Sequence, residues 1–399
     1  MHDRSLLPRR LRGLVLTGLA AACLVASGCS SSGATPGSTQ STGTIGSSGG
    51  TQTLSISAMN DDLAHYRGLV TNYPAVKPVG GLSALKGKTI WYIPIGSAVP
   101  ILHAYGVGIK AAFDKLGINY HTCDGRFLPT TIASCMSQAA TQGADGVITG
   151  YIDYALVPSA FDNLISHHIP VLVAGESPSG GKTDSPQLAF YDTTQSINLL
   201  QKLAAESIIV DSNGGAKVLF VGVTDSPQTK EAADYAKKFV ADNCVKCSFN
   251  EVDYNTASLN RVPSQVSAAL ISHPDTNYVF VELDAGVPGT ATGIQTAGFA
   301  NKVKMASTNG DLASLQRINS GQNHFVDVGV SPVYVGWMFA DGVIRMMVGE
   351  LPHVQPGIFR VFSKDNVAGL TLTPDAYATH AWYGPDTFQD TYLRAWGVL

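Results

Sequence analysis

Downstream of its N-terminal segment, this chain carries four cysteines in two close pairs, and they are the side chains whose chemistry is clearest. Cys123 and Cys135 form one pair, and Cys244 and Cys247 form the other. In an oxidising compartment, an even number of cysteines in local pairs favours disulfides. The Cys-x-x-Cys spacing also occurs in redox proteins, but here it follows a predicted helix over 228–243, whose dipole does not lower a thiol pKa. We therefore predict two structural disulfides.

Motifs for catalysis and cofactor binding are absent or misplaced. The body that follows the tether-like residues 30–53 has no Gly-x-Ser-x-Gly elbow, and the chain has no His-Glu-x-x-His motif; these are the signatures of serine hydrolases and zinc peptidases. Residues 106–111 match a dinucleotide-binding fingerprint, but the preceding strand is predicted to end near Ile95, so these glycines would lie inside a helix. His167 and His168 are adjacent on a predicted helix, and their side chains diverge. We expect no cofactor, no metal and no enzymatic activity; a secreted hydrolase is the remaining enzyme alternative.

Short β-rich runs alternate with helix-spaced apolar residues from Lys88 onward, in two consecutive series. The first series opens with a strand over 89–95 and closes with one over 170–174. The second opens with a helix over 194–210 and closes with one over 333–348. Such alternation predicts parallel sheets covered by helices on both faces. The fold class is therefore α/β, with two doubly wound parallel-sheet lobes joined by a multi-strand hinge.

The N-terminal segment predicts export and a lipid anchor. Four arginines precede an apolar run over residues 14–26, which ends in Ala-Ser-Gly-Cys at 26–29. A basic head, a short apolar body and small residues at the exit describe a secretory signal peptide. Residues 30–53 are almost wholly Ser, Gly, Thr, Pro and Gln, without charge, as in flexible tethers. We predict a signal peptide over 1–28, lipidation of Cys29 and a tether over 29–53; a plain secreted protein is the alternative.

The formal net charge is −4, and no basic stretch follows the signal segment. Nucleic acids and anionic membrane surfaces are therefore poor partners. The body is too long for one ordinary domain and suits two. The predicted parts are an extension over 54–86, a first lobe over 87–191 and 331–360, and a second lobe with an aromatic-rich tail over 192–330 and 361–399. We expect a monomer on the extracytoplasmic face of the cell membrane, held there by its lipid alone.

Three stretches of the body carry a family likeness. The first is Ile93-Pro94 with Pro100 and residues 108–117, the second is 143–148 with 153–156 and 169–171, and the third is 307–310 followed by 331–336. Over roughly 86–350 the chain resembles the type I periplasmic solute-binding family, in the branch of the ribose and related sugar receptors. The resemblance implies capture of a small, sugar-like ligand between the lobes and delivery to an ABC permease; a sensory receptor of the same fold is the alternative.

The resemblance also implies binding positions in the loops after the strands, where doubly wound sheets bind ligands. The predicted ligand-binding residues are Ile101, Leu102, Asp153, Glu176, Asp225, Gln228, Tyr254, Asp284 and Asn309.

Several of these positions depart from the family pattern. Relatives often clamp a sugar ring between aromatics where Ile101 and Leu102 stand, and often have an arginine in the loop of Asp225. These differences favour a ligand with a more apolar face than a simple pentose. Two candidates keep structural alternatives, because Tyr254 could pack on a neighbouring helix and Asp153 could cap one.

Overall fold

The computed structural model describes residues 53–399. The predicted signal peptide, the predicted lipidation site Cys29 and all but the last residue of the predicted tether lie outside these residues. Among residues 53–399, no helix combines the length and the apolarity needed to span a bilayer.

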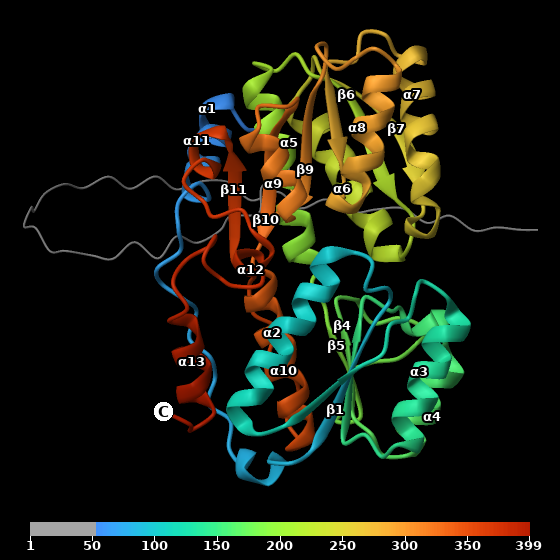
Figure 1. The fold of residues 1–399 in the computed structure, drawn as a ribbon, viewed down its shortest axis with the longest axis vertical. Helices are drawn as coiled ribbons and strands as arrows, with labels where there is room; N and C mark the ends of the chain where they lie inside the picture. Colours follow the sequence, from blue (N-terminus) through green and yellow to red (C-terminus); the bar gives the residue numbers. More distant parts are fainter. Residues whose placement is uncertain (1–52) are drawn as a thin grey trace, which may run out of the picture. The chain divides into compact units, whose positions relative to one another are not determined.

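Two β-sheets, each flanked by helices, organise this part of the chain (Figure 1). The first is parallel in the order β2-β1-β3-β4-β5; the second has the order β11-β10-β9-β8-β6-β7, with β11 antiparallel to β10. The strands are β1 (Thr89–Pro94), β2 (Asn119–Thr122), β3 (Gly146–Gly150), β4 (Val171–Ala174), β5 (Leu188–Tyr191), β6 (Lys217–Val223), β7 (Ser248–Tyr254), β8 (Tyr278–Val281), β9 (Lys304–Asn309), β10 (His324–Val330) and β11 (Phe359–Ser363). The prediction of an α/β fold with two parallel-sheet lobes is confirmed.

Helices connect the strands in both lobes. The longer ones are α1 (Ile56–His65), α2 (Pro100–Leu116), α3 (Pro129–Thr141), α4 (Pro158–Ser166), α5 (Thr194–Asp211), α6 (Pro227–Asn243), α7 (Val262–Ser272), α8 (Val287–Thr296), α9 (Leu312–Asn319), α10 (Pro332–Met347) and α13 (Phe388–Ala395). The short ones are α11 (Lys364–Val367), α12 (Pro374–Tyr377) and the 3-10 turns η1 (Leu82–Leu85), η2 (Tyr154–Leu156), η3 (Thr256–Arg261) and η4 (Asp284–Gly286). Proline occupies the first turn of α2, α3, α4 and α6, where a missing N–H costs nothing.

Helix α10 follows the second lobe in sequence but packs on α2 of the first lobe. The two helices approach closely where Gly108 faces Gly336. A Cβ atom on Gly108 would lie 2.5 Å from the carbonyl oxygen of Val333, and one on Gly336 would lie 2.5 Å from that of Tyr105. The glycines of the dinucleotide-like motif therefore lie inside a helix, as predicted, and Gly108 serves helix–helix packing.

The chain crosses between the lobes after β5, after β10 and again before β11. Strand β11 begins at Phe359 and belongs to the second sheet, whereas the predicted boundary kept residues up to 360 in the first lobe. The tail was assigned to the second lobe, but the structure divides it. Its helix α11 packs against α9 and β11 of the second lobe, while α13 packs against α10 of the first, through aromatic contacts to Trp337.

Residues 54–86 and 364–399 form a feature that we call the terminal strap. Its N-terminal part starts on the second lobe, where α1 packs on α5, and ends on the first, where η1 packs on α2. Its two parts are joined by backbone hydrogen bonds from Val70 N–H to the Tyr383 carbonyl (2.7 Å) and from Val79 N–H to the Ala395 carbonyl (2.9 Å). Both parts of the strap thus span the two lobes.

An aromatic cluster fixes α13 to the first lobe. The Trp396 ring stacks parallel on Trp337 with the centroids 5.4 Å apart. The Trp396 indole N–H donates to Asp341 Oδ1 (2.8 Å), and Asp341 also pairs with the buried Arg345, whose Nε lies 2.8 Å from Oδ2. Since Asp341 and Arg345 are both about 1% exposed, the tail completes a buried charged network.

Both cysteine pairs are disulfide-bonded. Cys123 at the end of β2 is joined to Cys135 of α3, and Cys244 is joined to Cys247 directly after α6. Each bond closes a short local loop in one lobe, so neither ties the two lobes together.

Candidate functional site

A cavity with an empty volume of about 970 Å³, open solvent at its mouth included, lies between the two lobes. Part of its lining comes from residues at or just after the ends of strands of both sheets, and the rest comes mainly from helices. The residues at strand ends are Ile95 and Tyr151 after β1 and β3, Thr193 after β5, Asp225 after β6, Thr256 after β7, Glu282 after β8, and Asn309 and Val330 at the ends of β9 and β10. The carboxyl ends of strands are where ligands bind in this architecture.

Five of the predicted ligand-binding residues line this cavity. They are Ile101 and Leu102 from α2, Asp225 and Gln228 from the loop and helix after β6, and Asn309 at the end of β9. Asn309 has a φ of 119°, in the left-handed region that non-glycine residues rarely adopt. The structure therefore brings these residues together from both lobes; their contact with a ligand stays a prediction.

Asp153 and Glu176 lie beside the cavity rather than in its lining. Asp153 lines a smaller neighbouring cavity together with Asp225. Its Oδ1 also accepts hydrogen bonds from the Ala155 N–H (2.6 Å) and the Ser179 hydroxyl (2.7 Å), so it does cap η2. Glu176 is buried, and this desolvation, with the nearby charge of Asp153, raises its pKa to about 8.

Tyr254 and Asp284 lie outside the lining, in the interior of the second lobe. Tyr254 ends β7 and its hydroxyl lies over Gly286, where a Cβ atom would be 2.7 Å away; it packs in the apolar core of that lobe. Asp284 is buried and accepts hydrogen bonds from the Ser307 hydroxyl (2.5 Å) and the Asp311 N–H (2.7 Å). Tyr254 ends a strand and Asp284 lies just after one, but neither side chain is part of the cavity lining.

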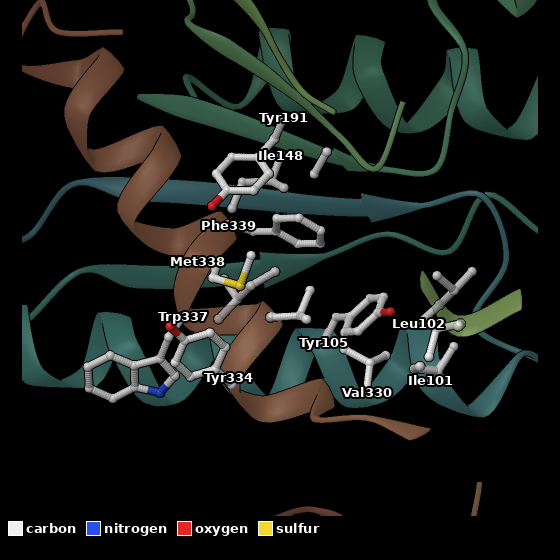
Figure 2. Close-up of a cluster of buried hydrophobic side chains, with 14 of the residues drawn as sticks. Ile101, Leu102, Tyr105, Ile148, Tyr191, Val330, Tyr334, Trp337, Met338 and Phe339 are labelled. Atoms are coloured by element: carbon white, nitrogen blue, oxygen red, sulfur yellow. The ribbon is translucent and has the colours of Figure 1, made fainter. Parts of the chain in front are cut away.

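The wall formed mainly by the first lobe is apolar. Ile101, Leu102 and Tyr105 come from the first turns of α2, and Met338 comes from α10. Figure 2 shows these side chains, with Val330 near Tyr105 and Leu102. Tyr105 stacks on Tyr151, another lining residue, with the ring centroids 6.1 Å apart. This wall offers a broad hydrophobic and aromatic surface to a bound molecule.

The wall formed by the second lobe, which we call the polar wall, carries acidic and amide side chains beside apolar residues such as Leu200 and Phe359. Glu282 is 1% exposed; its Oε2 accepts a hydrogen bond from the Val223 N–H (2.7 Å) and its Oε1 has no partner. The side-chain oxygens of Gln201 and Gln228 are buried and also lack partners. Burial raises the pKa of Glu282 well above its usual range. Asp225 is held in place by the N–H and hydroxyl groups of Thr256.

Gln201 and Glu282 were not among the predicted binding residues. Glu282 directly follows the apolar strand Tyr278–Val281, so its position after a strand was a usable signal. Gln201 lies in the middle of α5, and no local pattern distinguishes it from other helix residues. Within residues 53–399, no group of three or more His, Cys, Asp or Glu side chains is placed to hold a metal ion.

Comparison with solved structures identifies the fold. An ABC transporter solute binding protein from Agrobacterium vitis, bound with α-D-tagatopyranose, aligns with a TM-score of 0.64 and 17% identity over 74% of this chain and 99% of that chain. One from Burkholderia graminis, in complex with D-arabinose, has a TM-score of 0.61 and 21% identity over 72% and 99%. A Caulobacter myo-inositol binding protein, bound to myo-inositol, has a TM-score of 0.62 and 18% identity over 74% and 98%.

A family model described as the periplasmic binding protein domain matches residues 92–351. A search of curated proteins finds no match to the chain. The structural neighbours have the type I periplasmic binding fold, so the predicted resemblance is confirmed. Because the matched segment exceeds half of the chain, this protein belongs to the periplasmic binding protein domain family.

Proposed function

We propose that this protein captures a small polar solute between its lobes and delivers it to an ABC permease. The observation that carries the proposal is the cavity lined by strand ends of both lobes. Because the lining is contributed by both sides, a rotation of the lobes about the hinge crossings would expose or enclose a ligand. Binding and release by such closure require no bond chemistry, so we propose a receptor and not an enzyme.

A sugar-like ligand has support from the neighbours and from the polar wall. Tagatopyranose, arabinose and myo-inositol, the compounds bound in the three aligned proteins, are all polyhydroxylated. In this chain, the buried side-chain oxygens of Gln201, Gln228 and Glu282 could accept hydrogen bonds from ligand hydroxyl groups. The apolar wall around Ile101 and Leu102 favours a ligand with one hydrophobic face.

The test is a ligand screen with the purified full-length chain. Sugars, polyols, nucleosides and amino acids are added singly, and the melting temperature is measured. A ligand at a hundredfold excess over its Kd stabilises the folded state by about 2.7 kcal/mol, so a genuine ligand raises the melting temperature clearly. A Gln228→Leu variant should weaken the shift. A flat response to every solute, or turnover of any of them, would contradict the receptor proposal.

The lipid anchor at Cys29 and the extracytoplasmic location are further parts of the proposal. They rest on the basic head, the apolar run and the small residues that precede the cysteine. A Cys29→Ala variant should appear in the soluble extracellular fraction, while a Cys23→Ala variant, which removes the neighbouring cysteine, should stay with the membrane. Equal membrane retention of both variants would contradict lipidation. We also propose that the receptor acts as a monomer, which sedimentation of the purified chain tests.

A further inference from the structure

The ionisable acids in the lining of the cavity have no basic side chain beside them there. Its lining includes two carboxylic side chains, Asp225 and Glu282, and no Lys, Arg or His. A third, Asp153, lines the adjoining smaller cavity, and its charge contributes to raising the pKa of the buried Glu176. Asp225 and one oxygen of Glu282 accept hydrogen bonds, but neither carboxyl group has a cationic partner in the lining, and a buried carboxylate is stabilised best by one. Within residues 53–399, the lining thus offers these carboxyl groups no positive partner.

Three buried side-chain atoms of the polar wall lack hydrogen-bond partners and all three are oxygens, although hydroxyl and amide donors such as Ser196, Thr229 and Asn309 also line the cavity. Glu282 Oε1, Gln201 Oε1 and Gln228 Oε1 belong to lining residues, are buried and have no partner. The amide nitrogens of both glutamines are already used, Gln201 Nε2 toward the Glu282 carbonyl (3.5 Å) and Gln228 Nε2 toward the Thr194 hydroxyl (3.4 Å). The wall thus offers free acceptors, and buried acceptors are satisfied by donors.

A protonated amine matches the three unpartnered oxygens more closely than a neutral hydroxyl group does. Each sugar hydroxyl both donates and accepts, and a ring oxygen only accepts, so a neutral sugar would depend on the hydroxyl and amide donors of the lining as well as on these acceptors. A protonated amine donates through every N–H and accepts nothing, and its positive charge would favour the ionised form of the Glu282 carboxyl, which burial alone disfavours. The aromatic rings of Tyr105 and Tyr151 on the opposite wall also suit a cation, because ring faces attract positive charge.

We propose that the solute is an organic cation, a hydroxylated amine whose ammonium group binds at Glu282, Gln201 and Gln228 and whose carbon face packs on Ile101 and Leu102. This inference rests on the proposed function, since it names the ligand class of the same cavity. It assigns to the ligand the positive charge that the cavity lining lacks.

The test compares ligands that differ only in the amine. One pair is 1-deoxynojirimycin, a secondary amine, and 1,5-anhydro-D-glucitol, which has oxygen in place of that nitrogen; the second pair is D-glucosamine and D-glucose. Isothermal titration with the full-length chain measures each Kd at neutral pH. The amine of at least one pair should bind about tenfold more tightly or better, a difference of 1.4 kcal/mol.

Variants then locate the charge effect. Glu282→Gln should raise the Kd of the amine about thirtyfold or more, because it removes one member of a buried charge pair. The Kd of the neutral ligand should change by no more than about threefold. The matched control is Glu206→Gln, a buried glutamate of α5 that pairs with Lys202 and lies outside the lining; it should change neither Kd appreciably. Asp225→Asn serves as a second cavity variant if Glu282→Gln does not fold.

The outcomes separate the two proposals. If the neutral member of each pair binds as tightly as the amine, the cation inference is overturned while the receptor function stands. If neither member of any pair binds, and the broader sugar and polyol screen is also flat, the receptor function itself is overturned. Amine preference that survives Glu282→Gln and Asp225→Asn would also refute the proposed site.

Discussion

Replacing Trp396 tests whether the C-terminal tail is part of the first lobe's structure. Trp396 is 4% exposed, stacks on Trp337 and donates a hydrogen bond to Asp341. Truncating a buried tryptophan to alanine costs about 3–5 kcal/mol, because it removes apolar contacts and leaves a cavity. Trp396→Ala should therefore lower the free energy of unfolding by about this amount. Trp396→Phe keeps a ring against Trp337 but loses the N–H, so it should cost about 1.5–3 kcal/mol for a bond to a charged group.

The assay is urea unfolding followed by circular dichroism, with the midpoint and slope fitted for each variant. This chain has no exposed tryptophan that could serve as a matched control. The control is therefore Leu399→Ala, at the exposed end of the same tail, which should leave the free energy of unfolding nearly unchanged. If Trp396→Ala costs less than about 1 kcal/mol, the aromatic cluster does not hold the tail in place and the reasoning is refuted.

Two other predictions concern packing and pH. Gly336→Ala should lower the free energy of unfolding by about 1–3 kcal/mol, because its Cβ would lie 2.5 Å from the Tyr105 carbonyl and push α2 away from α10. Gly349→Ala is the comparison variant. Its Cβ would meet no atom but its φ is positive, so it measures the cost of backbone strain without the clash. Burial raises the pKa of Glu176 to about 8 from 4.5. Its stabilising contribution is therefore complete below pH 4.5 and is lost as pH rises through 8, so Glu176→Gln should flatten the fall in melting temperature between pH 5 and 9. An unchanged pH profile would contradict the assignment to Glu176.

The elements could be predicted because buried parallel strands are unbroken apolar runs. The strands expected over 89–95 and 170–174 appear as Thr89–Pro94 and Val171–Ala174, and the helix expected over 194–210 appears as Thr194–Asp211. Each is framed by proline, glycine or polar residues that local rules recognise.

The direction of a side chain at a strand end could not be predicted in the same way. Tyr254 ends a strand and Asp284 lies just after one, yet both side chains point into the lobe's interior, because Gly286 leaves room for the ring and Ser307 offers a partner to the carboxyl. Such contacts join residues that are more than twenty positions apart. The same holds for Gln201, which reaches the cavity only because α5 packs beside the end of β8.

The terminal strap affects how far the lobes can rotate. A receptor whose lobes are joined only through hinge crossings can swing about one axis with little resistance. In this chain, residues 54–86 connect α5 to α2, and the tail runs beside them to α10. A wide swing would have to deform both parts of the strap, which are bonded to each other, or peel α1 or α13 from its lobe. We therefore expect the two lobes to open by only a small angle. Solute would then enter and leave through a narrow gap, and its exchange would be slow.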